Sequence, residues 1–365
     1  MVDWTKSMTQ SFEYYYVDEN TWKDKTRLSS VISSDFQRDL TSETLGSATF
    51  NTHEFDGEKY IRTYLIVVQN GIRERICLNT SLVQTPSLSF DGKVFSKNLQ
   101  AYSPLYELKD GKPPVGYYLK IGSNILESAI TLITEHCRAP VVRKTFSKNL
   151  LTDFVADSGD DWLTFISDLL GQAEHHIALS PSGEIILEKD VKFSETIPIW
   201  EFNDDNSSIL LPSITMEYDL CDIPNTVEVI YSDDKNYIFS RAVNDDPDSP
   251  TSTVSRGREI LARVTQPVIV GNPTQDEVDD YAQRTLEQMS TVTYKLNYSH
   301  GYCPVTIGDS IRLNYKKAGL YNIKAKVMSQ TYNCSKSMSV SETAAFPVNL
   351  WKGTMSHVKP PAKHS

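Results

Sequence analysis

The feature that most constrains the fold is an Asn70-Gly71 pair that separates two apolar segments. These segments are residues 60–68 (YIRTYLIVV) and 72–78 (IRERICL). Asn and Gly both tolerate the positive φ angles of a two-residue hairpin turn, so the pattern is a strong signal for a β-hairpin. A second pair, Asp91-Gly92, predicts another hairpin. We expect the first hundred residues to form an antiparallel sheet that closes on itself, because closure removes exposed strand edges.

Three segments carry apolar residues at the spacing of amphipathic helices. Residues 124–137 begin with Asn124 and Glu127 at the spacing of a capping-box variant, and residues 160–174 have a wide apolar stripe. The third helix opens at Thr274, forms a T-x-x-E capping box and runs to residue 290. Strands are expected at residues 177–179, 185–187, 213–218, 226–231, 237–241, 292–299, 305–315 and 321–332. A turn at 233–236 is expected between the strands at 226–231 and 237–241. The chain is therefore predicted to be α+β, mainly β.

The length of 365 residues predicts more than one compact unit. A single hydrophobic core stops growing at roughly 250–300 residues, so we expect roughly two to four units. Composition changes at residues 110–114 (DGKPP), which neither a helix nor a central strand accommodates, and we place a domain boundary there. Residues 356–365 have the composition of a flexible tail.

The charge balance excludes some functions. Lys and Arg number 36 and Asp and Glu 47, so the net charge is −11. Tight binding to nucleic-acid phosphates requires a concentrated basic surface and is not expected as the main function. No apolar run is long enough to span a bilayer, so we expect no membrane insertion by this chain. The first twenty residues lack the pattern of an export signal, which predicts synthesis and assembly in a cytoplasm.

Cysteines and histidines offer few catalytic or metal-binding patterns. Five scattered cysteines without a C-x-x-C pair predict reduced, mostly buried thiols: Cys77, Cys137, Cys221, Cys303 and Cys334. His175-His176 could suggest a metal site, but adjacent histidines point in different directions and no third ligand stands at a suitable spacing. His136-Cys137 could suggest a base and a nucleophile, but helix neighbours do not face each other. We predict no metal, no cofactor and no catalytic residue.

Acidic residues could in principle form a cation site or a carboxylate pair for glycoside hydrolysis. Asp157, Asp160 and Asp161 stand directly before a predicted helix, where carboxylates cap free N–H groups, so capping is the preferred interpretation. Asp204-Asp205-Asn206 lacks the glycine and distal glutamate of a calcium loop and is interpreted as a turn.

Tyrosine is abundant, with 19 residues, including Tyr14, Tyr15 and Tyr16. An aromatic ring with a polar tip suits half-exposed sheet faces and subunit interfaces, and plain core packing explains the pattern equally well.

Three segments resemble the tail hub proteins of phages and phage-derived particles. Residues 213–229 resemble the strand-turn-strand of that family, through Ser213-Ile214-Thr215, Asp219-Leu220 and 224–229 (PNTVEV). Residues 161–188, a W-x-x-x-I-x-x-L-L helix followed by a hairpin at Ser182-Gly183, are similar to its α/β region. The predicted helix at 274–290, then Tyr294-Lys295-Leu296, His300 and 304–313 (PVTIGDSIRL), resembles the start of its second barrel.

The resemblance implies two antiparallel β-barrels, the second discontinuous, and an α/β region. The domains then are an N-terminal β-barrel at 1–108, an α/β domain at 109–205 with an inserted segment at 241–291, and a second β-barrel at 206–240 and 292–355. Three subunits of this kind make a pseudo-sixfold ring that matches a sixfold tail tube on one side and a threefold spike or fibre on the other.

The function that the resemblance implies is structural and not enzymatic. We expect a homotrimeric hub of a virion tail tip or baseplate, and its expected partners are a distal tail or tube-ring protein, the tape measure protein and a central spike or tail fibre. Genomic DNA would pass transiently through the lumen, and excess carboxylates would limit its adhesion. Two alternatives stay open: a cell-wall hydrolase that uses Asp157, Asp160 and Asp161, and a carbohydrate- or receptor-binding module with tyrosine stacking platforms.

Overall fold

The computed structural model describes residues 2–53, 57–90, 92–93, 95–142, 146–205, 207–232, 237–265, 267, 273–335 and 337–350. The protein is mainly β, with 47% strand and 16% helix, which confirms the predicted fold class. The chain divides into two compact units. Unit 1 comprises Met1–Ile197, Ser299–Asp309 and Val327–Glu342, and unit 2 comprises Pro198–Tyr298, Ser310–Lys326 and Thr343–Ser365.

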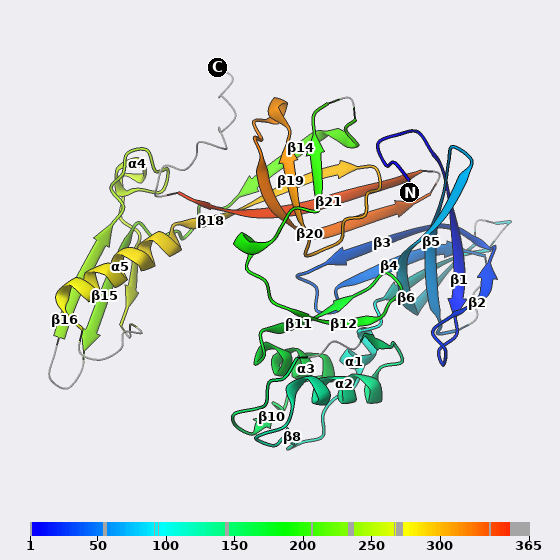
Figure 1. The fold of residues 1–365 in the computed structure, drawn as a ribbon, viewed down its shortest axis with the longest axis horizontal. Helices are drawn as coiled ribbons and strands as arrows, with labels where there is room; N and C mark the ends of the chain where they lie inside the picture. Colours follow the sequence, from blue (N-terminus) through cyan, green and yellow to red (C-terminus); the bar gives the residue numbers. More distant parts are fainter. Residues whose placement is uncertain are drawn as a thin grey trace. The chain divides into compact units, whose positions relative to one another are not determined.

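Unit 1 contains an antiparallel sheet that pairs some strands with their neighbours in the sequence and others with strands far away in the sequence. Its strands are β1 (Thr9–Val17), β2 (Asp24–Leu28), β3 (Val31–Asp39), β4 (Gly46–Thr52), β5 (Tyr60–Gln69), β6 (Ile72–Phe90) and β7 (Phe95–Tyr102), joined by parts of β20 (Ile323–Cys334) and β21 (Met338–Asn349). Their order is β2-β1-β5-β6-β7-β4-β3-β20-β21 (Figure 1). β6 is long enough to pair with β5 along its first half and with β7 along its second half.

The Asn70-Gly71 hairpin is confirmed. Asn70 has a φ of 52° and Gly71 a φ of 77°, and the strands close with Gln69 paired to Ile72. The second predicted hairpin joins β6 to β7 through the pair Phe90 and Phe95, whereas Asp91 lies outside the described residues.

A single core fills the inner side of this sheet. It receives Tyr14 from β1, Phe50 from β4, Leu65 from β5 and Tyr332 from β20. Strands near both ends of the order contribute to the same cluster, so the sheet curls around it. Within the described residues, however, no closed barrel is found, and closure into two barrels stays a prediction.

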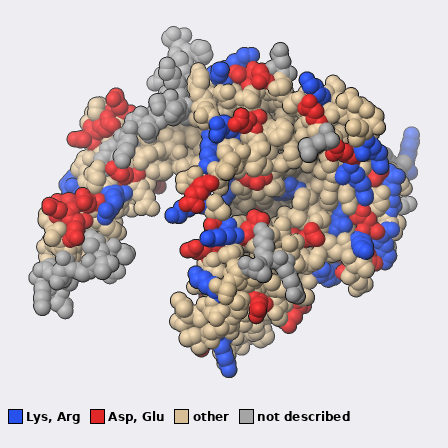
Figure 2. All heavy atoms as spheres, in the orientation of Figure 1, with Lys and Arg blue, Asp and Glu red and all other residues tan. Residues whose placement is uncertain are grey.

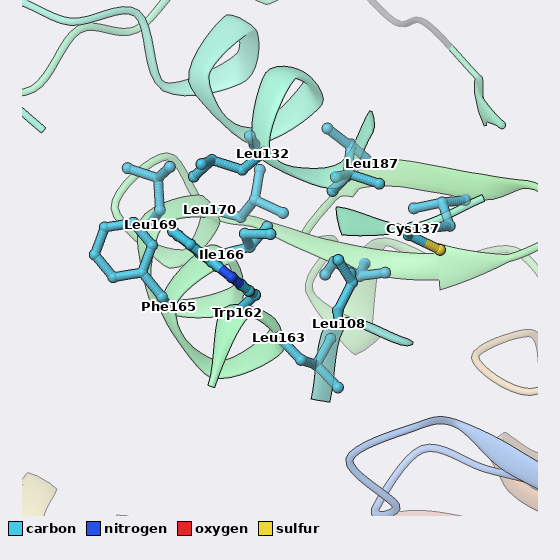
Figure 3. Close-up of a cluster of buried hydrophobic side chains, with 14 of the residues drawn as sticks. Leu108, Leu132, Cys137, Trp162, Leu163, Phe165, Ile166, Leu169, Leu170 and Leu187 are labelled. Carbon is cyan, nitrogen blue, oxygen red and sulfur yellow. The ribbon is translucent and has the colours of Figure 1, made fainter. Parts of the chain in front are cut away.

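A helical subdomain of unit 1 follows this sheet in the chain. Its elements are α1 (Tyr106–Asp110), β8 (Tyr118–Leu119), α2 (Ile125–His136), β9 (Val141–Val142), β10 (Phe154–Val155), α3 (Trp162–Gly171), β11 (His175–Leu179), β12 (Ile185–Lys189) and the 3-10 turn η1 (Phe193–Glu195). The apolar stripes of α2 and α3 meet in one core, which includes Leu132, Ile166, Leu108 and Leu187 (Figure 3). The predicted caps at Asn124 and Asp161 are confirmed, because Asn124 accepts from Glu127 N and Asp161 accepts from Thr164 N.

Unit 2 contains a sheet and a smaller α/β module. The sheet has the order β14-β18-β21-β20, with β19 pairing β20 and β13 pairing β19. The strands that are new here are β13 (Trp200–Asn203), β14 (Leu210–Tyr218), β18 (Thr291–His300) and β19 (Ser310–Asn314), and the 3-10 turn η2 (Lys316–Ala318) follows β19. β18, β20 and β21 supply residues to both units.

The α/β module consists of β15 (Thr226–Ser232), β16 (Tyr237–Val243), α4 (Thr253–Arg256), β17 (Leu261–Val264) and α5 (Gln275–Met289). Helix α5 lies along one face of the sheet β16-β15-β17, and Val229 packs against Val278 and Ala282 (Figure 1). The capping box of Thr274 and Glu277 is present as predicted. The predicted turn at 233–236 and the tail at 356–365 lie outside the described residues, and the predicted domain boundaries stay predictions.

Candidate functional site

The first polar site lies where the β11–β12 hairpin tip meets the sheet of unit 1. Arg62, on β5, is buried there and donates to the carbonyl oxygen of Ser182 over 2.8 Å. Arg62 also donates to Thr80 Oγ1 over 3.0 Å and to Asp24 Oδ1 over 3.2 Å. Trp22 Nε1 donates to the same Ser182 carbonyl over 2.8 Å. We call this group the hairpin anchor; it holds the hairpin through main-chain atoms.

The turn at the hairpin anchor requires glycine. Gly183 has a φ of +80°, in the left-handed region that favours glycine. A Cβ added there would lie 2.9 Å from Thr80 Cβ, which is closer than real contacts allow. The sequence predicted the turn at Ser182-Gly183 but not its docking on β5 and β6.

The second site is the outer face of the strands β1, β2, β5 and β6. We name it the arginine–tyrosine face, and it consists of Tyr15, Arg27, Tyr64, Arg73 and Arg75. The Arg75 guanidinium lies 3.5 Å from the centre of the Tyr64 ring and 4.6 Å from that of Tyr15, which is cation–π geometry. In Figure 2 basic side chains gather over the part where these strands lie in Figure 1, with acidic ones interleaved.

Two carboxylates hold the arginine–tyrosine face together. Glu13 lies 3.3 Å from Arg27 and 3.0 Å from Arg73, and Asp24 Oδ2 accepts from Arg75 over 2.9 Å. Tyr64 OH donates to Asp24, and burial together with this hydrogen bond raises the pKa of Tyr64 to about 12. The face is therefore a prearranged, charged surface in which Tyr64 is neutral at neutral pH.

A buried polar cluster joins β18, β20 and β21 within unit 1. His300 Nε2 lies 3.3 Å from Glu342 Oε2, and Gln330 Nε2 donates to the same oxygen over 2.7 Å. Cys303 Sγ lies 3.8 Å from His300 Nδ1, so a thiol, an imidazole and a carboxylate stand in the order of a nucleophilic triad. Burial raises the pKa of the Cys303 thiol far above its ordinary value, which opposes formation of a thiolate nucleophile. The arrangement fits a structural network inside the sheet.

The paired histidines do not converge on one site. His175 Nδ1 contacts the carbonyl oxygen of Ala173 and its ring stacks on Phe146 at 3.8 Å. His176 instead pairs with Asp190 Oδ1 over 2.6 Å. Successive residues of a strand point to opposite faces, as the sequence interpretation assumed.

His136 and Cys137 are likewise separated. The His136 ring stacks on Trp162 at 4.2 Å, while the Cys137 thiol is buried and donates to the carbonyl oxygen of Pro104. Burial raises the pKa of the Cys137 thiol to about 12, so it is a protonated core residue at neutral pH.

The aspartates take local structural roles. Asp161 caps α3, and Asp160 Oδ2 accepts from Asp157 N over 2.8 Å in the preceding turn. Asp204 Oδ2 accepts from Lys316 N, and Asp205 Oδ1 accepts from Ser207 N over 2.8 Å. Asn206 lies outside the described residues.

The described ranges contain neither a candidate metal-binding group nor a candidate membrane-spanning helix. In these ranges, no group of three or more His, Cys, Asp or Glu side chains could hold a metal ion. In the same ranges, no helix combines the length and the apolarity needed to cross a membrane.

The tyrosines divide between the two predicted roles. Tyr14 lies in the core of unit 1, where its OH group and Ser34 Oγ are 3.1 Å apart. Tyr15 lies on the arginine–tyrosine face. Adjacent positions on β1 thus serve a core and a surface.

The fold that carries these sites is the fold of phage-type tail proteins. The structure of a tail protein from Neisseria meningitidis MC58 matches with a TM-score of 0.58 over 94% of this chain and 98% of that one, at 13% identity. The 43 kDa tail protein of prophage MuSo2 from Shewanella oneidensis matches with a TM-score of 0.57 over 91% of this chain and 97% of that one, at 10% identity. The resemblance to tail proteins expected from the sequence is confirmed at the level of the fold. No protein-family model matches the sequence, and no curated protein matches it either.

Proposed function

We propose that this chain is a structural subunit of a phage-type tail, the hub of a baseplate or tail tip. The observation that carries the proposal is the extent of the match to tail proteins. It covers 94% of this chain and 98% of the Neisseria tail protein, so the likeness extends over nearly the whole of both chains.

The proposed assembly is a homotrimeric ring. The strands of one 13-stranded sheet divide between unit 1 and unit 2, so three chains would supply six such sheet portions to a pseudo-sixfold ring. The two barrels of the proposal are at 1–108 and at 206–240 with 292–355, beside the α/β domain at 109–205 and the insertion at 241–291. Such a ring would adapt a sixfold tube to a threefold spike or fibre.

The proposed partners are a distal tail or tube-ring protein, the tape measure protein and a central spike or tail fibre. Genomic DNA would pass through the lumen of the ring. The net charge of −11 supports this part of the proposal, because carboxylates repel the phosphates of passing DNA. The subunit would be made and assembled in the host cytoplasm and end in the virion tail tip.

The hydrolase alternative is less well supported than the structural role. Its candidate carboxylates already have local tasks, since Asp161 caps α3 and Asp160 holds the turn at Asp157. Zymography on bacterial cell walls tests this alternative directly. Lysis that an Asp157, Asp160 and Asp161 alanine set abolishes would favour it over a purely structural hub.

The test of the hub proposal is the mass of the purified chain in solution. Light scattering across a concentration series should give a mass near three times 41.2 kDa. Electron microscopy of tails that carry a labelled copy should then place the label at the tail tip. A monomer at every concentration, or a label elsewhere in the tail, would contradict the proposal.

A further inference from the structure

The arginine–tyrosine face has the composition of a protein-binding surface. Arginine and tyrosine are the residue types enriched in the centres of interfaces, where they supply most of the binding energy. Arg27 and Arg73 have 61% and 57% of their side-chain surface exposed. Val68, opposite Arg73 in the β5–β6 register, adds an exposed apolar side chain. The opposite side of these strands packs on the core, and on this side the exposed side chains of Arg27 and Arg73 are open to a partner.

The charge of this surface specifies an acidic occupant. The three arginines of the face, Arg27, Arg73 and Arg75, pair with two carboxylates, Glu13 and Asp24, which leaves a surplus of one positive charge. The whole chain has a net charge of −11, so the surface contrasts with the rest of the molecule. Each guanidinium carries five N–H donors, and those of Arg27 and Arg73 can bind further carboxylates in bidentate geometry.

A second copy of this chain can supply those carboxylates. This step rests on the proposed ring: a closed ring of three identical subunits uses a heterologous contact, in which each subunit presents two different, complementary surfaces. The first half of α5 exposes Asp276 and Asp280, which are four residues apart and lie on the same side of the helix. Its opposite side packs on β15 through Val278 and Ala282. The acidic side of α5 is therefore free of the module's own core.

We propose that the arginine–tyrosine face of one subunit binds the acidic side of α5 of the next subunit in the ring. Arg27 and Arg73 are the residues that meet Asp276 and Asp280, and Tyr15 and Tyr64 supply the rigid contact area beside them. Charge complementarity of this kind sets which surface meets which and speeds association.

A charge-reversal experiment with a rescue arm tests the pairing. The variants are Arg27→Glu with Arg73→Glu, Asp276→Lys with Asp280→Lys, and the four substitutions combined. The matched control is Lys120→Glu with Lys148→Glu, which changes two exposed basic residues elsewhere and shifts the net charge by the same amount. Light scattering across concentration and salt series measures the trimer, and circular dichroism confirms that each variant is folded.

Each double variant should raise the dissociation constant of the trimer by on the order of 100-fold. The fourfold variant should recover most of that loss, and the control pair should remain trimeric. Trimer formation by the wild type should weaken as salt is raised, because exposed charges are screened. Rescue is the decisive result, since it requires the two surfaces to meet.

Two results would overturn the proposed pairing of these two surfaces but not the proposal that the chain forms a ring. A trimer that persists in the Arg27→Glu, Arg73→Glu variant would show that this surface has another occupant, such as an acidic tail partner. Loss of the trimer without rescue in the fourfold variant would remove α5 as its counterpart. A wild-type chain that stays monomeric throughout would overturn the ring itself and the pairing with it.

Discussion

Replacing Arg62 with methionine should destabilise unit 1 by about 3 kcal/mol. The guanidinium donates to Thr80 Oγ1, to the carbonyl oxygens of Trp22 and Ser182, and to Asp24. Removing one partner of a buried ion pair costs about 3–5 kcal/mol, because the remaining groups stay buried without their donors. Asp24 keeps Tyr64 OH and Arg75 as donors, so the lower end of this range applies. Methionine fills the volume of the arginine stem, which limits any added cavity.

Urea unfolding followed by tryptophan fluorescence measures this loss, and Trp22 reports from the hairpin anchor itself. The matched control is Arg263→Met, because Arg263 also pairs with a carboxylate, Glu228, over 2.8 Å but has 55% of its side chain exposed. An exposed pair of this kind contributes less than about 1 kcal/mol. Equal destabilisation by Arg62→Met and Arg263→Met would refute the assignment of Arg62 as the residue that holds the hairpin.

Two further predictions concern the glycine turn and the buried thiols. Gly183→Ala should destabilise the protein by about 2 kcal/mol more than Gly116→Ala in urea unfolding. Both glycines have a φ near +80°, but only at Gly183 would the new Cβ meet Thr80. Equal destabilisation by the two substitutions would mean that the hairpin tip is not docked. Burial raises the pKa of the Cys77 thiol to about 11 and the pKa values of the Cys137 and Cys334 thiols to about 12, whereas the value in the unfolded chain is about 9. Above pH 9 the folded state therefore keeps protons that the unfolded state releases. The urea midpoint should fall as the pH rises from 9 toward 12. The decrease of the urea midpoint with pH should be smaller in the Cys137→Ala variant. A wild-type midpoint that does not change between pH 8 and pH 11 would contradict the predicted pH dependence.

Local sequence signals located the Asn70-Gly71 turn and three helix starts correctly. The Asn70-Gly71 turn, the Asn124 and Asp161 caps and the Thr274 capping box each depend on residues within three positions of one another. Such features leave a recognisable pattern in a single sequence, because the interacting groups are neighbours in the chain.

Long-range contacts left no such pattern. Arg62 and Ser182 are 120 positions apart, and His300 and Glu342 are 42 apart. An arginine is ordinarily exposed, and Arg62 is buried because the hairpin docks on it. The arginine–tyrosine face depends in the same way on the register of four strands, which a single sequence does not encode locally.

The hairpin anchor has a consequence for how this fold can diverge. Three donors, Arg62, Thr80 and Trp22, meet carbonyl oxygens of Pro181 and Ser182, and every residue type provides such an oxygen. Mutational drift on the accepting side therefore leaves the contact intact, provided that the backbone path through Gly183 is kept. Only one of the two docked surfaces records the contact in its amino-acid identities, so the residues at the hairpin tip can change while the same subdomain stays attached to the same sheet.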